Sequence, residues 1–121
     1  MDEALSRTGP EGEGLRKRLD EAVVLMGTVD QLRKDLGVEA IQQPAVGDGA
    51  FEELRAQVEA ILEAREREGA QALGRVVNRV DLTEPQLRAA MASGGLHGLA
   101  GAIILRCLQK VLSRMRFAGL G

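Results

Sequence analysis

The sequence has few aromatic, cysteine and histidine residues, and these shortages exclude several classes of structure. Phe51 and Phe117 are its only aromatic residues, and it contains no tryptophan or tyrosine. The single cysteine, Cys107, cannot form an internal disulfide, so the fold does not need an oxidising compartment. One histidine, His97, and one cysteine are too few for an ordinary zinc site, which takes several Cys and His ligands. We therefore expect no disulfide scaffold, no metal and no other cofactor.

The sequence also lacks a long hydrophobic run. Its longest apolar stretch, from Leu96 to Leu105, covers ten residues and includes a histidine and two glycines. A membrane-spanning helix needs about 20 apolar residues. The first residues, MDEALSRTGPEGEG, carry acidic side chains and no apolar run, so they are not typical of a signal peptide. These absences predict a cytoplasmic protein without a transmembrane segment.

The composition is that of one folded domain with an uneven charge. At 121 residues, with 45% hydrophobic and 28% charged residues, the chain is long enough to bury a core and too apolar for wholesale disorder. All 18 acidic residues and 11 of the basic ones lie in residues 1–85. Residues 86–121 contain five basic residues and no acidic one, so the C-terminal third is cationic.

The first third of the chain predicts a tail and a helix. Residues 1–14 are rich in glycine and predict a flexible tail, which leaves residues 15–121 as a single helical domain. Apolar residues four and three apart predict one helix from Leu15 to Leu36, ended by Gly37. A short buried strand at residues 22–26 is the alternative. Residues 37–49 predict a loop, with Asp48 as a candidate N-cap.

The middle of the chain has the longest apolar stripe. If residues 50–80 form one long central helix, a single face carries Phe51, Leu54, Val58, Ile61, Leu62, Leu73, Val76 and Val80. Glycine costs about 1 kcal/mol inside a helix, so a hinge near Gly69 is the alternative to a continuous helix. Such a long stripe is difficult to cover within a short chain. We therefore expect these eight residues to form an interface with another helical protein or with a second copy.

The clearest local signal lies at residues 81–86. Thr83 and Gln86 have the spacing of a capping box, and Pro85 suits a first helical turn. They predict a helix over residues 84–93, a break at Gly94 and Gly95, and a last helix over residues 96–117. Together the segments predict an all-α fold, a small bundle of about four helices with almost no strand.

The helix–Gly-Gly–helix pattern also suggests two binding functions. One is a helix-turn-helix, but residues 97–101 offer none of the Arg, Lys, Asn or Gln side chains that read bases. The other is a phosphate site on the glycines before the last helix, but no Lys-Ser or Lys-Thr pair follows them. Close packing of helices at small residues explains the pattern better.

Two side chains are candidates for chemistry. A general base needs an orienting partner and a substrate pocket, and the sequence shows neither near His97. Cys107 lies on a largely apolar helix, where a free cysteine usually behaves as a small hydrophobic residue. We therefore expect no catalytic residue and no enzyme.

The last candidate is a basic stripe formed by Arg106, Lys110, Arg114 and Arg116. It could complement acidic residues of the chain or of a second copy, bind an anionic surface of membrane lipid or nucleic acid, or be solvated near a helix C-terminus. Single-stranded nucleic-acid binders usually add stacking aromatics, and only Phe117 is near. The sequence thus predicts a small non-enzymatic helical interaction or assembly module, with anionic-surface binding through the C-terminal helix as the alternative.

Overall fold

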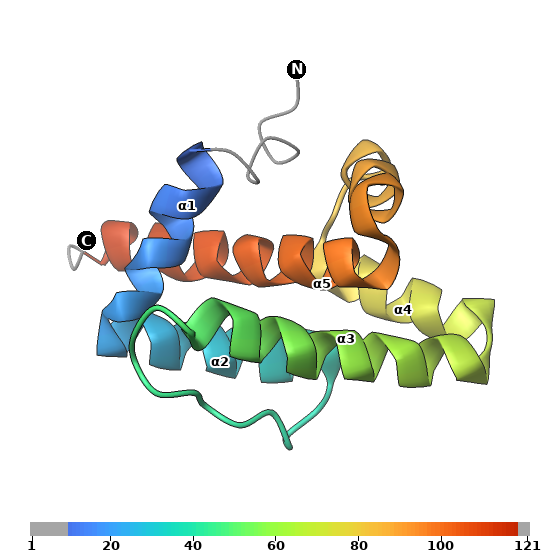
Figure 1. Ribbon diagram of the computed structural model, residues 1–121, viewed down its shortest axis with the longest axis horizontal. Helices are drawn as coiled ribbons and strands as arrows, with labels where there is room; N and C mark the ends of the chain where they lie inside the picture. The colour runs from blue at the N-terminus through green and yellow to red at the C-terminus, as the bar shows by residue number, and fades with distance from the viewer. Residues whose placement is uncertain (1–9, 119–121) are drawn as a thin grey trace.

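The computed structural model describes residues 10–118, and within that range the protein is all-α (Figure 1). The elements are α1 (Pro10–Lys17), the 3-10 helix η2 (Arg18–Asp20), α2 (Ala22–Leu36), α3 (Ala50–Glu68), α4 (Ala70–Val80) and α5 (Glu84–Phe117). The predicted small helical bundle is confirmed. The alternative of a strand at residues 22–26 is wrong, because these residues begin α2.

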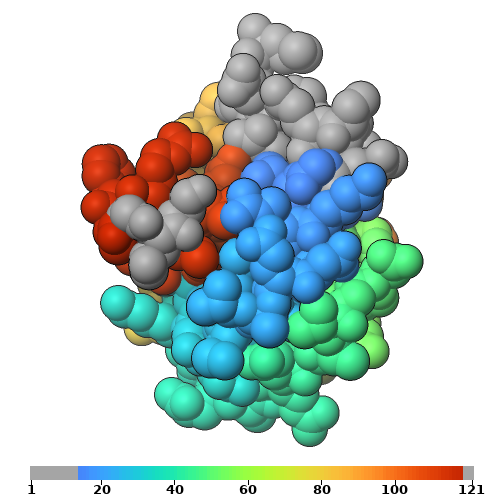
Figure 2. Space-filling model, turned by 90° about the vertical axis from the view of Figure 1, so that its left-hand side faces the viewer, coloured from blue at the N-terminus to red at the C-terminus, as the bar shows by residue number. Residues whose placement is uncertain are grey.

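The core lies where α2 and α3 run along the second half of α5 (Figure 1). Its fully buried side chains are mostly leucine and isoleucine, and include Leu25, Leu32, Leu54, Leu62, Leu99, Ile103, Ile104 and Leu108. Burying each of these contributes about 1.5–3 kcal/mol relative to leaving it in water. At one end of the molecule, α1 and the start of α2 lie between the C-terminal end of α5 and the start of α3 (Figure 2).

The single helix predicted over residues 15–36 is wrong at Glu21. This residue has φ −94° and ψ 119°, which is extended backbone, and it separates η2 from α2. The helix before the break begins at Pro10 rather than at Leu15. Residues 1–9 of the predicted tail lie outside the described residues. The break lets α1 cross α5 while α2 runs along it (Figure 1). As predicted, α2 ends at Gly37, which has φ 67° and ψ 33°.

The middle of the chain is hinged, so the continuous helix over residues 50–80 is wrong. Gly69 separates α3 from α4 with φ 120° and ψ 165°, a conformation almost confined to glycine. The alternative of a hinge near Gly69 is thereby confirmed. The predicted N-cap at Asp48 is also wrong, because the N-cap of α3 is Gly49, and no side chain caps the helix there.

The start of the last helix matches its prediction. The backbone N–H of Gln86 donates to Thr83 Oγ1 at 3.2 Å, and the backbone N–H of Thr83 donates to Gln86 Oε1 at 2.9 Å. The helix is broken at Gly94 and Gly95, which have non-helical backbone angles. We call residues 84–93 the arm and residues 96–117 the trunk. The arm stands steeply against the trunk (Figure 1).

Gly98 allows the arm to pack closely on the trunk. A Cβ atom at this position would overlap the carbonyl oxygen of Ala90 on the arm. The predicted role of small residues in helix packing is thus confirmed at Gly98. At Gly94 nothing lies within 4 Å of the position of a Cβ, so that glycine serves the break rather than the packing.

By length and composition alone, α5 could cross a membrane, with a mean hydropathy of 1.3 over its most apolar window. However, 44% of that window is buried inside the chain, and the helix is broken at Gly94 and Gly95. These are the features of the core helix of a bundle.

Candidate functional site

The apolar stripe predicted as a partner interface is the core of the chain itself. Six of its eight residues are buried within the chain: Phe51, Leu54, Val58, Leu62, Val76 and Val80. The other two, Ile61 and Leu73, are partly buried and pack against the same core. The hinge at Gly69 and the trunk of α5 allow a single chain to cover the whole stripe. The six buried side chains are therefore not available to a partner in the folded chain.

The basic stripe is divided between different environments. Lys110 Nζ donates to Asp35 Oδ2 at 2.7 Å and lies 3.5 Å from Asp81 Oδ2. Arg114 Nη1 donates to Gln31 Oε1 at 2.7 Å. Lys110 therefore complements acidic residues of its own chain, which was the first of the three interpretations.

The remaining two residues of the basic stripe lie apart. Arg106 lines a cavity, and Arg116 is exposed near the end of α5. Binding of an anionic surface by these four side chains stays a prediction.

Cys107 is buried between α2 and α5. Its Sγ lies 3.6 Å from Asp35 Oδ2 and donates to it. Burial raises the pKa of the Cys107 thiol far above its ordinary value, and the negative charge of Asp35 raises it further. The thiol therefore stays protonated, and only the thiolate is a good nucleophile. Its predicted behaviour as a small buried residue is confirmed.

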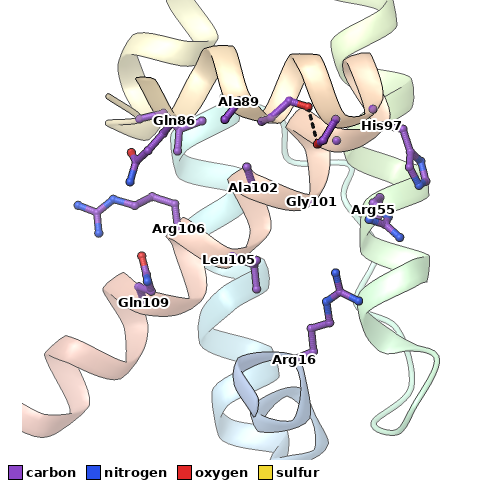
Figure 3. Close-up of a pocket in the computed structure, with 15 residues that line it drawn as sticks. Arg16, Arg55, Gln86, Ala89, His97, Gly101, Ala102, Leu105, Arg106 and Gln109 are labelled. Carbon is purple, nitrogen blue, oxygen red and sulfur yellow. Dashed lines mark hydrogen bonds between the residues drawn. The ribbon is translucent and has the colours of Figure 1, made fainter. Parts of the chain in front are cut away.

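The most prominent candidate site is a cavity of about 260 Å³ between the arm, the trunk, α1 and α3 (Figure 3). Its apolar lining consists of small or aliphatic residues, including Leu82, Ala89, Ala90, Gly98, Ala102 and Leu105. The sharp turn at Gly94 and Gly95 creates this space, because it holds the arm at an angle to the trunk.

The charged part of the cavity lining is cationic. Arg16 comes from α1, Arg55 from α3 and Arg106 from the trunk, and none of the described lining residues is acidic. The whole chain has a net charge of −2, so the cavity differs in sign from the molecule that surrounds it. A recess lined by one sign of charge concentrates ions of the opposite sign.

Two of the arginines lie close to one aromatic ring. Arg16 Cζ lies 4.3 Å from the centroid of the Phe51 ring, and Arg55 Cζ lies 5.2 Å from it. Arg55 Nη2 pairs with Glu52 Oε2 at 2.6 Å. By contrast, Arg16 Nε is buried without a hydrogen-bond partner, the only such side-chain atom among the described residues. A buried donor without an acceptor costs about 1–3 kcal/mol.

His97 also lines the cavity, and the structure gives it a partner that the sequence does not show. His97 Nδ1 lies 2.8 Å from Glu59 Oε1, so the ring donates to the carboxylate. The two residues are 38 positions apart, and Glu59 is one of many acidic residues on α3. The structure thus supplies both the orienting partner and the pocket that a general base needs.

Sequence reasoning also missed that Arg16 and Arg55 meet at the cavity. Each belongs to an ordinary charged helix face, and no local pattern indicates that α1 and α3 bring them to one ring.

The described residues contain no group of three or more His, Cys, Asp or Glu side chains that could hold a metal. No family model, curated protein or solved structure matches the chain. The cavity is therefore interpreted from its own geometry.

Proposed function

We propose that the protein is a small non-enzymatic binding module whose cavity between arm and trunk takes a small organic molecule. The observation that carries this proposal is a cavity of about 260 Å³ with an apolar floor and a few polar groups at its edges. Ligand sites usually have this composition, and their volumes start at about 300 Å³. The ligand is therefore small. A cytoplasmic location stays a prediction.

The side chains around the cavity support binding rather than covalent chemistry. Nucleophilic catalysis needs a nucleophile within hydrogen-bond reach of a base. The Ser93 hydroxyl instead donates to the carbonyl oxygen of Ala90 at 3.1 Å. Cys107 is buried with a raised thiol pKa. Neither side chain is arranged as a nucleophile for His97.

Assembly through an apolar surface has less support. The exposed large hydrophobic residues of the described chain are Val23, Met26, Val46 and Phe117. Val23 and Met26 share one face of α2 because they are three residues apart. Two side chains cover far less than the roughly 800 Å² per partner of a standard interface. We therefore place ligand binding ahead of self-association.

A ligand screen followed by nuclear magnetic resonance tests the proposal. We expect ligands to shift the amide signals of cavity residues in the wild-type protein. Ala102→Leu fills the floor of the cavity and is expected to weaken binding about tenfold or more, a loss of about 1.4 kcal/mol or more. Ala60→Leu is the matched control, because Ala60 is exposed on α3 and does not line the cavity.

The result against the proposal is equally specific. If no compound shifts the signals of cavity residues, or if Ala102→Leu binds as well as wild type, the cavity is not a ligand site.

General-base catalysis is the second candidate function, and the pair of His97 and Glu59 beside the cavity favours it. Product analysis of esters and amides incubated with the protein separates it from binding alone. Turnover that disappears in both His97→Gln and Glu59→Gln would establish an enzyme. Under our proposal the wild-type protein shows no turnover, and His97→Gln keeps its ability to bind ligand.

A further inference from the structure

We infer that the ligand of this cavity is a small amphiphilic anion, with a carboxylate or phosphate head group bound between Arg16 and Arg55 and an apolar body on the trunk. This inference rests on the proposed function and names the class of ligand. It follows from three observations at one end of the cavity.

The first observation is an unbalanced pair of cations. Arg16 and Arg55 both lie beside the ring of Phe51, and Arg55 is paired with Glu52. The Arg55 side chain is only 17% exposed, so water screens its charge poorly. Glu52 is the only carboxylate within residues 10–118 that forms an ion pair with either guanidinium group, although Asp20 and Asp48 line a second, smaller recess with Arg16. A second negative charge placed between the two guanidinium groups would be stabilised by both.

The second observation is the unused hydrogen-bonding capacity of Arg16. Its Nε is buried and lacks an acceptor among residues 10–118. A guanidinium group does not lose its proton in a protein, so Arg16 stays a donor, and an acceptor supplied by a ligand would satisfy its Nε. In Figure 3, Arg16 extends from α1 toward the cavity, and Arg55 lies on the same side of it below His97. Oxygen atoms of a carboxylate or phosphate match the fork of arginine donors at this place.

The third observation is the close approach of Arg55 to the trunk. A Cβ at Gly101 would lie 3.2 Å from Arg55 Nη1 and 3.7 Å from Phe51 Cζ. The glycine therefore lets the guanidinium and the ring lie directly against the trunk backbone. Ala102 and Leu105 continue the same stretch of lining with apolar surface. A head group held at Arg55 would thus have its apolar body next to these two residues.

The test compares three unbranched probes that each contain six carbon atoms: hexanoate, hexyl phosphate and hexanol. Each is titrated by calorimetry into the wild-type protein at constant ionic strength. At least one of the two anions is expected to bind about tenfold or more tightly than hexanol, since hydrogen bonds to charged groups are the stronger ones. The ratio between hexanoate and hexyl phosphate then tells a carboxylate site from a phosphate site.

Charge-removing variants locate the head group. Arg16→Gln and Arg55→Gln are each expected to lose about tenfold or more in anion affinity and to bind hexanol as before. Arg16→Lys keeps the positive charge but lacks the paired donors of a guanidinium group. Its anion affinity is expected to lie between those of the wild type and Arg16→Gln. Arg75→Gln is the matched control, because Arg75 is exposed on α4 and does not line the cavity. A cooperative melting transition in each variant shows that it is folded.

Two results overturn the inference and leave the proposed function intact. One is hexanol binding in the cavity as tightly as both anions. The other is anion binding that survives in Arg16→Gln and Arg55→Gln alike. Failure of the proposed function differs from both, because then no compound of the wider screen shifts the cavity signals.

Discussion

Gly98 is the residue at which the arm and the trunk of α5 come closest. The place of a Cβ is taken there by the backbone oxygen of Ala90, and a backbone atom cannot move aside as a flexible side chain can. Gly74 is the opposite case, because it lies inside α4 with nothing within 4 Å of a Cβ. The same substitution at the two glycines should therefore change stability in opposite directions.

We expect Gly98→Ala to lower the free energy of unfolding by about 1–3 kcal/mol, the usual cost of overpacking. Gly74→Ala should raise it by up to about 1 kcal/mol, because alanine is the better helix former. Urea denaturation followed by circular dichroism measures both. If Gly98→Ala were as stable as wild type, the arm would not be packed on the trunk as described.

At the scale of the elements, local signals in the sequence identified two helix boundaries that a side chain or a glycine determines. The capping box at Thr83 and the left-handed Gly37 are such boundaries, and both are confirmed. The break at Glu21 had no such signal, because glutamate is a good helix former and its extended backbone follows from how α1 crosses α5. Tertiary packing decided that boundary, and periodicity alone favoured a longer helix.

Periodicity also could not decide between a bent and a straight helix in the middle of the chain. The apolar stripe continues past Gly69 in either case, and only the backbone angles of that glycine separate the two. The candidate site was less predictable still, because Arg16, Arg55 and His97 come from three helices. These three side chains come together because of the hinge at Gly69 and the position of the arm. Both features arise only in the assembled bundle.

The hinge gives a prediction for α3 and α4. Gly69→Ala should lower the free energy of unfolding by about 1–3 kcal/mol, because a side chain at φ 120° is strained even though nothing crowds it. Thermal or urea denaturation measures the change, and Gly74→Ala in the neighbouring helix is the control. A stabilised Gly69→Ala variant would mean that the straight helix over residues 50–80 is accessible to the folded chain.

At the scale of the whole molecule, the long apolar stripe does not need a partner protein to cover it. The trunk, α2 and α4 cover it within one chain, and every residue of the stripe is buried or partly buried. Our proposal accordingly places binding in the recess between arm and trunk rather than on an outer helix face. A chain that covers its own apolar stripe can be stable as a monomer. Its oligomeric state therefore tests this description.

We therefore expect the protein to sediment as a monomer of 13.0 kDa, with no dependence of the apparent mass on concentration. The exposed pair on α2, with Val23 at 62% and Met26 at 50% exposure, is the strongest basis for a dimer among the described residues. Met26→Glu should leave the monomer unchanged, whereas it would dissociate a dimer formed through that face. Sedimentation equilibrium of both proteins over a wide concentration range measures this. A dimer that Met26→Glu abolishes would restore self-association as a function and place its interface on α2, because the stripe over residues 51–80 is already covered.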